Sequence, residues 1–75
     1  MQYMDLTPFH WFLMEQNHEQ VVYRLKNNPF IEVKIQPDGA FAFIGYSPFT
    51  EHPEMDVSVE AQHEAAELAD FYLNA

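Results

Sequence analysis

The sequence lacks cysteine and is poor in basic residues and glycine, and each shortage narrows the functions open to it. Because none of the 75 residues is cysteine, disulfide bridges, thiolate zinc sites and cysteine nucleophiles are excluded. Three Lys and Arg stand against twelve Asp and Glu, which gives a formal net charge of −9. Duplex DNA binding usually rests on roughly six to ten phosphate contacts, so we expect no direct nucleic-acid binding. With only two glycines, the chain has no glycine-rich loop to hold nucleotide phosphates.

Long hydrophobic runs are also missing. The longest apolar run near the N-terminus, from Trp11 to Met14, is far shorter than the ~20 residues that a membrane span needs. The first residues carry no basic region of the kind that opens a secretory signal. From these two absences we expect a soluble protein of the cytoplasm that does not act on membranes.

Apolar residues are nevertheless abundant enough to form a core. The chain is 48% hydrophobic and 16% aromatic, which is too much for a disordered acidic tail. A chain of this length buries only about 60% of its unfolded surface, so it can support one thin core and no separate substrate domain. We therefore expect residues 1–75 to form a single small acidic domain.

The first third of the chain predicts a helix. Thr7 followed by Pro8 is typical of an N-cap with proline at the first helical position. At 100° per residue the apolar side chains up to Leu25 fall into two arcs, and the Asn27-Asn28-Pro29 stretch ends the pattern. An alternative stays open, because Val21, Tyr23 and Leu25 also alternate. In that alternative residues 20–26 form a strand and the sheet is a three-stranded meander.

The middle of the chain predicts a β-hairpin. Ile31, Val33 and Ile35 alternate with polar residues in 30–36, which is the pattern of a half-buried strand. The Pro37-Asp38-Gly39 turn leads into a second strand over 40–46. In that strand Phe41 and Phe43 share one face, and the other face is also apolar (Ala42, Ile44 and Tyr46). At least one of the two faces therefore needs cover from a helix or from a partner, and a face left uncovered is a candidate contact surface.

The C-terminal third predicts an irregular segment followed by a second helix. Pro48 and Pro53 interrupt residues 47–59, and from Ser58 to Asn74 the apolar residues recur with helical spacing. One face of this helix carries Ala61, Ala65, Leu68, Ala69 and Tyr72. The fold class predicted is α+β, with α-β-β-α order and two helices packed on a short antiparallel β-hairpin.

The negative charge is concentrated in the last third of the chain. Residues 1–50 hold five acids and all three bases, whereas residues 51–75 hold seven acids and no base. Like charges at i, i+4 spacing destabilise a helix by a few tenths of a kcal/mol, so this pattern is either a solvated face or a surface that a basic partner neutralises. Phe71 falls inside the acidic arc, and aromatic residues among polar groups are enriched at binding hot spots. The predicted partner-binding residues are Glu51, Glu54, Asp56, Glu60, Glu64, Glu67, Asp70 and Phe71.

No motif predicts catalysis or a cofactor. The serines and threonines have no recognisable elbow or companion base, so no catalytic residue is assigned and an enzyme is not expected. Glu15 with His18, and Glu60 with His63, have the Glu-x-x-His spacing of di-iron bundles. Those bundles need four helices, and this chain is too short for them. We therefore expect no metal site and no cofactor.

In size and charge the chain resembles the small acidic proteins of phages and mobile elements that block nucleic-acid-binding machines, such as anti-restriction and anti-CRISPR inhibitors. The resemblance is one of type and rests on no aligned motif. It implies a DNA mimic whose acidic surface binds a basic protein groove, such as the nucleic-acid channel of a host protein, inside the host cell of a phage. The alternative function is a small assembly or regulatory subunit that binds a partner, or a second copy, through exposed apolar surface.

Overall fold

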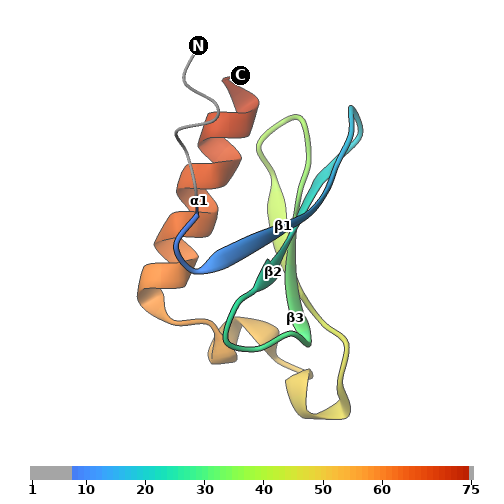
Figure 1. Ribbon diagram of the computed structural model, residues 1–75, viewed down its shortest axis with the longest axis vertical. Helices are drawn as coiled ribbons and strands as arrows, with labels where there is room; N and C mark the ends of the chain where they lie inside the picture. The colour runs from blue at the N-terminus through green and yellow to red at the C-terminus, as the bar shows by residue number, and fades with distance from the viewer. Residues whose placement is uncertain (1–7, 75) are drawn as a thin grey trace.

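A computed structural model describes residues 8–74, in which a four-stranded antiparallel sheet packs against one C-terminal helix (Figure 1). The strands follow one another in the order β1-β2-β3-β4. Two short 3-10 turns, η2 and η3, connect the last strand to the helix. The elements are β1 Trp11–Gln16, β2 Val21–Leu25, β3 Ile31–Ile35, β4 Phe41–Gly45, η2 Pro48–Thr50, η3 Pro53–Asp56 and α1 Val59–Leu73. The α+β class is as predicted, but the two-helix description is wrong.

The predicted first helix is instead the hairpin β1–β2. The two apolar arcs of the helical interpretation do not match the faces of the strands, because Val21 and Val22, which share a helical arc, point to opposite sides of the sheet. Aromatic and β-branched residues such as Trp11, Val21 and Val22 favour strands. The alternative with a strand at residues 20–26 is therefore right for that segment, although the sheet has four strands rather than three. Thr7, the predicted N-cap, lies outside the described residues.

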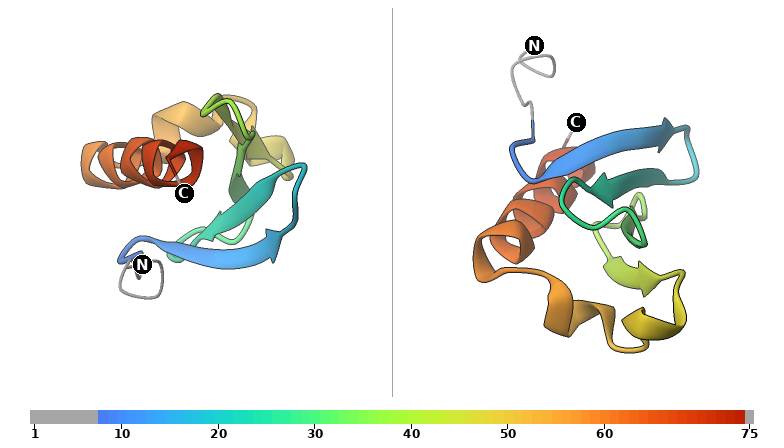
Figure 2. Two further views of the ribbon diagram at one scale, coloured as in Figure 1. Left: turned by 90° about the horizontal axis from the view of Figure 1, so that it is seen from above. Right: turned by 60° about the horizontal axis from the view of Figure 1, so that its bottom comes forward.

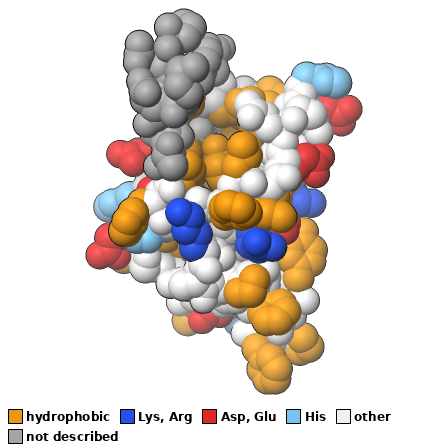
Figure 3. All heavy atoms as spheres, in the orientation of Figure 1, with side chains coloured by type: hydrophobic (Ala, Val, Ile, Leu, Met, Phe, Trp, Pro, Cys, Tyr) orange, Lys and Arg blue, Asp and Glu red, His pale blue; other side chains and the backbone are white. Residues whose placement is uncertain are grey.

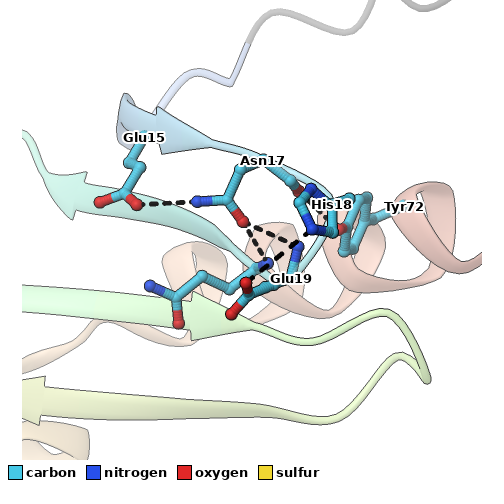
Figure 4. Close-up of polar contacts among 6 residues, drawn as sticks. Glu15, Asn17, His18, Glu19 and Tyr72 are labelled. Carbon is cyan, nitrogen blue, oxygen red and sulfur yellow. Dashed lines mark hydrogen bonds and ion pairs between the residues drawn. The ribbon is translucent and has the colours of Figure 1, made fainter.

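Asn17 forms the turn that reverses the chain between β1 and β2 (Figure 4). Its side-chain oxygen accepts hydrogen bonds from the backbone N–H groups of Glu19 at 2.7 Å and Gln20 at 3.0 Å. This Asx turn satisfies backbone donors that a helix would have bonded within itself. The Tyr72 hydroxyl donates to the carbonyl oxygen of Asn17 at 3.1 Å, so the turn is also fastened to the C-terminal end of α1.

The second hairpin has the predicted positions. β3 and β4 fall within residues 30–36 and 40–46, and the turn between them places Gly39 at a φ of 87°, which L side chains rarely adopt. The Asp38 carboxylate accepts a hydrogen bond from Ala40 N–H at 2.9 Å, as the turn chemistry predicted.

The core lies between the sheet and α1, and the sheet bends around the helix (Figure 2). The inner face of β3 is completely buried, and the predicted apolar face of α1 packs against the sheet. Trp11 crosses between the two layers, because its indole N–H donates to the carbonyl oxygen of Ala61 at 2.8 Å and its ring stacks on Phe43 at 5.9 Å between centroids. The buried core residues are Trp11, Val21, Leu25, Ile31, Val33, Ile35, Val57, Ala61, Ala65, Leu68 and Ala69.

The segment from β4 to α1 is irregular in outline, as predicted, but firmly anchored. Thr50 is buried, and its hydroxyl accepts from Ser47 N–H at 3.0 Å and donates to the Ser47 carbonyl at 2.8 Å. Gly45 leaves the room for Thr50, because a Cβ on Gly45 would overlap the Thr50 backbone oxygen. The first 3-10 turn is therefore held directly against the end of β4.

Candidate interaction surface

Helix α1 carries most of the predicted surface. The Ser58 hydroxyl caps its start by accepting a hydrogen bond from Ala61 N–H at 3.1 Å. Glu60, Glu67 and Asp70 are exposed on the side of the helix away from the core. Here the term acidic surface means the six exposed acids of the last third, namely Glu51, Glu54, Asp56, Glu60, Glu67 and Asp70.

Glu64, the seventh acid, has a contact within the chain. Its two carboxylate oxygens accept hydrogen bonds from the backbone N–H groups of Phe9 and His10, both at 2.7 Å. Glu64 is half-buried as a result and fastens the segment that enters β1 to the middle of α1. Hydrogen bonds to an ionised carboxylate are about twice as strong as neutral ones, so this contact stabilises the fold. The surface available to a partner is therefore carried by the other six acids.

Glu64 also influences Tyr23 on the inner face of β2. Burial, and after it the negative charge of Glu64, raise the pKa of the Tyr23 phenol above its ordinary value. Tyr23 belongs to the partly buried residues that pack against the core. Its hydroxyl is therefore part of the support beneath α1 rather than part of the exposed surface.

Phe71 lies beside acids, as the sequence predicted. Glu67, Asp70, Phe71 and Asn74 line a shallow depression of about 370 Å³ at the C-terminal end of α1. Phe71 itself is half-buried, whereas the two acids beside it are exposed. The structure thus brings these three predicted residues together at one end of the helix.

The loop acids lie on the two 3-10 turns, at the other end of α1. The side-chain amide of Gln62 donates to the carbonyl oxygens of Glu54 at 3.2 Å and Val57 at 2.8 Å, which holds the second turn against the helix. Glu51, Glu54 and Asp56 are exposed on this anchored segment.

Two apolar residues of this loop segment, Phe49 and Met55, were missed from the sequence. Phe49 is 91% exposed and Met55 is 79% exposed, although each sits on an anchored turn. The signal that could have found them is the proline at the start of each turn. Pro48 and Pro53 each open a short turn, and each turn presents one apolar side chain to solvent.

The basic residues lie away from the acidic surface. Arg24 and Lys34 point to the face of the sheet opposite α1, and the Lys26 ammonium donates to the Pro8 carbonyl at 3.3 Å. Lys and Arg side chains lie among hydrophobic ones on the face towards the viewer in Figure 3. Within residues 8–74 the one ion pair is between His18 and Glu19, at 3.8 Å, so no base neutralises the acidic surface from inside the described chain.

The sheet face opposite α1 is uncovered in the described part of the chain. Phe12 and Ala42 are exposed there, Ile44 is half-buried, and Val22 at the centre of the face is buried. This is the uncovered face of the second hairpin strand that the sequence predicted, extended across all four strands by the hairpin β1–β2. Here the term open sheet face means Phe12, Glu15, Val22, Arg24, Glu32, Lys34, Ala42 and Ile44.

The Glu-x-x-His units do not form paired ligand sites on two helices. Glu15 lies in β1 and His18 in the following turn, so the helical spacing assumed for this unit does not exist. No cluster of three or more His, Asp or Glu side chains suited to a metal ion occurs within residues 8–74. Over the same range, no helix has both the length and the apolar character needed to cross a membrane.

Comparison with known proteins adds no relative. No protein-family model matches the sequence, and neither a curated protein nor a solved structure shows significant similarity to the chain. The features that bear on function are therefore the acidic surface and the open sheet face of this chain.

Proposed function

We propose that this protein is a non-enzymatic binding protein whose acidic surface docks into a basic groove of a nucleic-acid-binding protein and blocks it. The observation that carries the proposal is the segregation of charge. Six exposed acids follow one another along the loop and α1 without an ion-pair partner in the described chain, while the bases lie on the sheet. The proposed site consists of the acidic surface together with Phe71.

The physical basis is long-range attraction between surfaces of opposite sign. A cleft lined with bases attracts a one-sign acidic surface and raises the rate of association, and added salt weakens this attraction. A groove built for phosphate groups offers such a lining. The proposed partner is therefore a protein rather than a nucleic acid, and the proposed outcome is inhibition by occupancy of the groove.

A second candidate function follows from the exposed apolar residues. Phe49 and Met55 protrude from the anchored loop, and the open sheet face presents Phe12, Ala42 and Ile44. Exposed apolar patches of this kind are typical of surfaces that bind other proteins. In this role the protein would be a small assembly or regulatory subunit whose binding depends little on salt.

The experiment that tests the first proposal compares two triple variants with equal net charge. The site variant is Glu60→Gln, Glu67→Gln, Asp70→Asn. The matched control is Glu15→Gln, Glu19→Gln, Asp38→Asn, in which exposed acids of β1 and of the two hairpin turns are neutralised instead. Both remove three negative charges, and neither touches Glu64.

Wild type and both variants are immobilised, exposed at low salt to a lysate depleted of nucleic acid, and eluted with a salt step. We expect basic nucleic-acid-binding proteins to be retained by wild type and by the control variant, and lost from the site variant. If the two variants retain the same proteins in the same amounts, the acidic surface is not the binding site. Retention that survives high salt and the site variant would favour the second candidate.

A further inference from the structure

A self-complementary row of side chains crosses the open sheet face. The register pairs Phe12 with Arg24, Arg24 with Glu32, and Glu32 with Ile44, so these four residues lie side by side on β1, β2, β3 and β4. All four point away from α1, because their chain neighbours Trp11, Leu25, Ile31 and Val33 are buried in the core and Phe43, the neighbour of Ile44, packs against it. The row therefore runs from an apolar residue through a base and an acid to a second apolar residue.

The two charges in the middle of this row are available for a contact outside the chain. Arg24 and Glu32 are direct cross-strand neighbours, yet within residues 8–74 they form no ion pair. The Arg24 guanidinium lies over the Phe12 ring instead, 5.6 Å from its centroid. Both side chains are half-buried, so each keeps part of its contact with water and can still be reached by a partner.

The charge of the open sheet face differs from that of the rest of the molecule. Arg24 and Lys34 balance Glu15 and Glu32, so this face is neutral on a chain whose formal net charge is −9. Two copies of a strongly acidic protein repel one another wherever their acidic surfaces meet. The open sheet face is where a second copy meets the least repulsion.

We propose that a second copy of this chain docks on the open sheet face, related by a two-fold axis that runs along the strands between β2 and β3. Rotation about this axis reverses the order of the strands in the facing sheet, so that β2 lies opposite β3 and β1 lies opposite β4. It therefore sets Arg24 of each copy opposite Glu32 of the other, and Phe12 opposite Ile44. A closed two-fold interface needs this self-complementarity, and the row supplies it through the two Arg24–Glu32 pairs at its centre, with apolar residues at its two ends.

The shape of the sheet sets the size of this contact. Because the sheet bends around α1, its open face is convex, and two copies touch mainly along β2 and β3 (Figure 2). A small interface with charge pairs at its centre is typical of reversible association, with a dissociation constant of about micromolar order. The acidic helices then lie on the two outer sides of the dimer. The inference goes beyond the proposed function and does not depend on it.

Charge reversal at the central pair tests the arrangement, with the mass in solution measured by sedimentation equilibrium. At about 100 µM, well above a micromolar dissociation constant, the wild type should approach twice the 8.8 kDa of one chain. Arg24→Glu brings two acids together across the axis, and Glu32→Arg brings two bases together. We expect each single variant to be monomeric at the same concentration. Glu67→Arg on α1, with the same charge change as Glu32→Arg, should remain dimeric.

Mixing the two single variants in equal amounts gives the decisive result. In a mixed dimer each introduced charge meets one of opposite sign, so we expect the dimeric mass to return. The double variant Arg24→Glu, Glu32→Arg should dimerise alone for the same reason. Recovery on mixing also shows that the single variants are folded, which far-UV circular dichroism checks independently.

Three results would overturn the inference. A wild type that stays at 8.8 kDa at this concentration shows that no second copy covers the face, and leaves it to a different protein. Single variants that remain dimeric place the interface elsewhere. Single variants that are monomeric and stay so on mixing show that Arg24 and Glu32 do not face each other across the axis.

Discussion

Glu64 is an acid of the predicted binding surface whose carboxylate makes a contact within the chain instead. From the sequence it belongs with Glu60 and Glu67 on one arc of a helix, and nothing in that pattern separates the three. In the structure its two oxygens bind the backbone N–H groups of Phe9 and His10, more than fifty residues earlier in the chain. A contact this distant in sequence cannot be read from helical periodicity, which reports only on the face of one element.

Replacing Glu64 should destabilise the protein. Glu64→Gln keeps the size of the side chain but removes the charge and one of the two acceptors, so the free energy of unfolding should fall by about 1 to 2 kcal/mol. Urea denaturation followed by circular dichroism measures the change. Glu67→Gln, an exposed neighbour one turn away, is the control and should stay within about 0.5 kcal/mol of wild type. Equal stability of the two variants would mean that the Glu64 contact contributes nothing.

The raised pKa of the Tyr23 phenol predicts a loss of stability at high pH. Because burial and the charge of Glu64 raise the pKa of its phenol, the unfolded state releases this proton at a lower pH than the folded state. The stabilisation is therefore complete below the ordinary tyrosine pKa of about 10 and is lost as the pH rises through the higher folded value. The midpoint of urea unfolding, measured between neutral pH and pH values above 10, should fall for the wild type more steeply than for Tyr23→Phe. Parallel curves would contradict this assignment.

At the scale of elements, the strands of the second hairpin and the C-terminal helix could be predicted, and the first hairpin could not. Ile31, Val33 and Ile35 alternate without exception, and the helix from Ser58 has a cap and one apolar face, so local pattern and final structure agree there. In residues 8–26 the apolar residues satisfy a helical and a strand pattern at once. The choice depends on pairing with β3 and on the Asn17 turn, and both lie outside a single-element pattern.

The candidate interaction surface could likewise be predicted only in part. The concentration of acids in the last third is a property of composition, and their exposure on α1 follows from its apolar face. The exposure of Phe49 and Met55 depends instead on how the two 3-10 turns are anchored by Thr50 and Gln62. These are tertiary contacts, and the spacing of residues in the sequence does not predict them.

The packing of the first turn against β4 predicts that Gly45 is essential. A methyl group at Gly45 would overlap the backbone oxygen and the side chain of Thr50, and a backbone atom cannot move aside as a flexible side chain can. Gly45→Ala should therefore displace the turn and destabilise the protein by about 1 to 3 kcal/mol, as overpacking does elsewhere. Thermal unfolding measures the effect. Ala42→Gly, which removes a methyl group on the same strand instead of adding one, is the control. A thermal midpoint for Gly45→Ala equal to that of wild type would show that the turn is not held at this position.

At the scale of the whole molecule, the protein has two unlike surfaces on opposite sides of one thin core. One side carries the exposed acids of α1 and its preceding loop, and the other carries the neutral open sheet face with two of the three bases. Within residues 8–74 the one ion pair is between His18 and Glu19, so no ion pair links the acids of one side to the bases of the other. The two proposals assign a basic partner to the first side and a second copy to the other.

This separation predicts different responses to salt. Binding through the acidic surface should weaken by an order of magnitude or more, roughly, between low salt and 0.5 M salt, because exposed charges are screened within about a Debye length. Self-association through the open sheet face, which joins apolar residues and only two charge pairs, should weaken much less. Sedimentation equilibrium and partner retention measured over the same salt series separate the two. Equal salt dependence would indicate one shared surface.

The most direct test of the central claim is a competition between this protein and DNA for a partner retained at low salt. Fluorescently labelled duplex DNA is bound to the purified partner, and its anisotropy is followed as this protein is added. We predict that wild type displaces the DNA completely, and that the variant Glu60→Gln, Glu67→Gln, Asp70→Asn requires at least about ten-fold more protein to do so, equivalent to about 1.4 kcal/mol. DNA that stays bound while this protein also binds, giving a ternary complex, would contradict the claim that its acidic surface occupies the nucleic-acid groove.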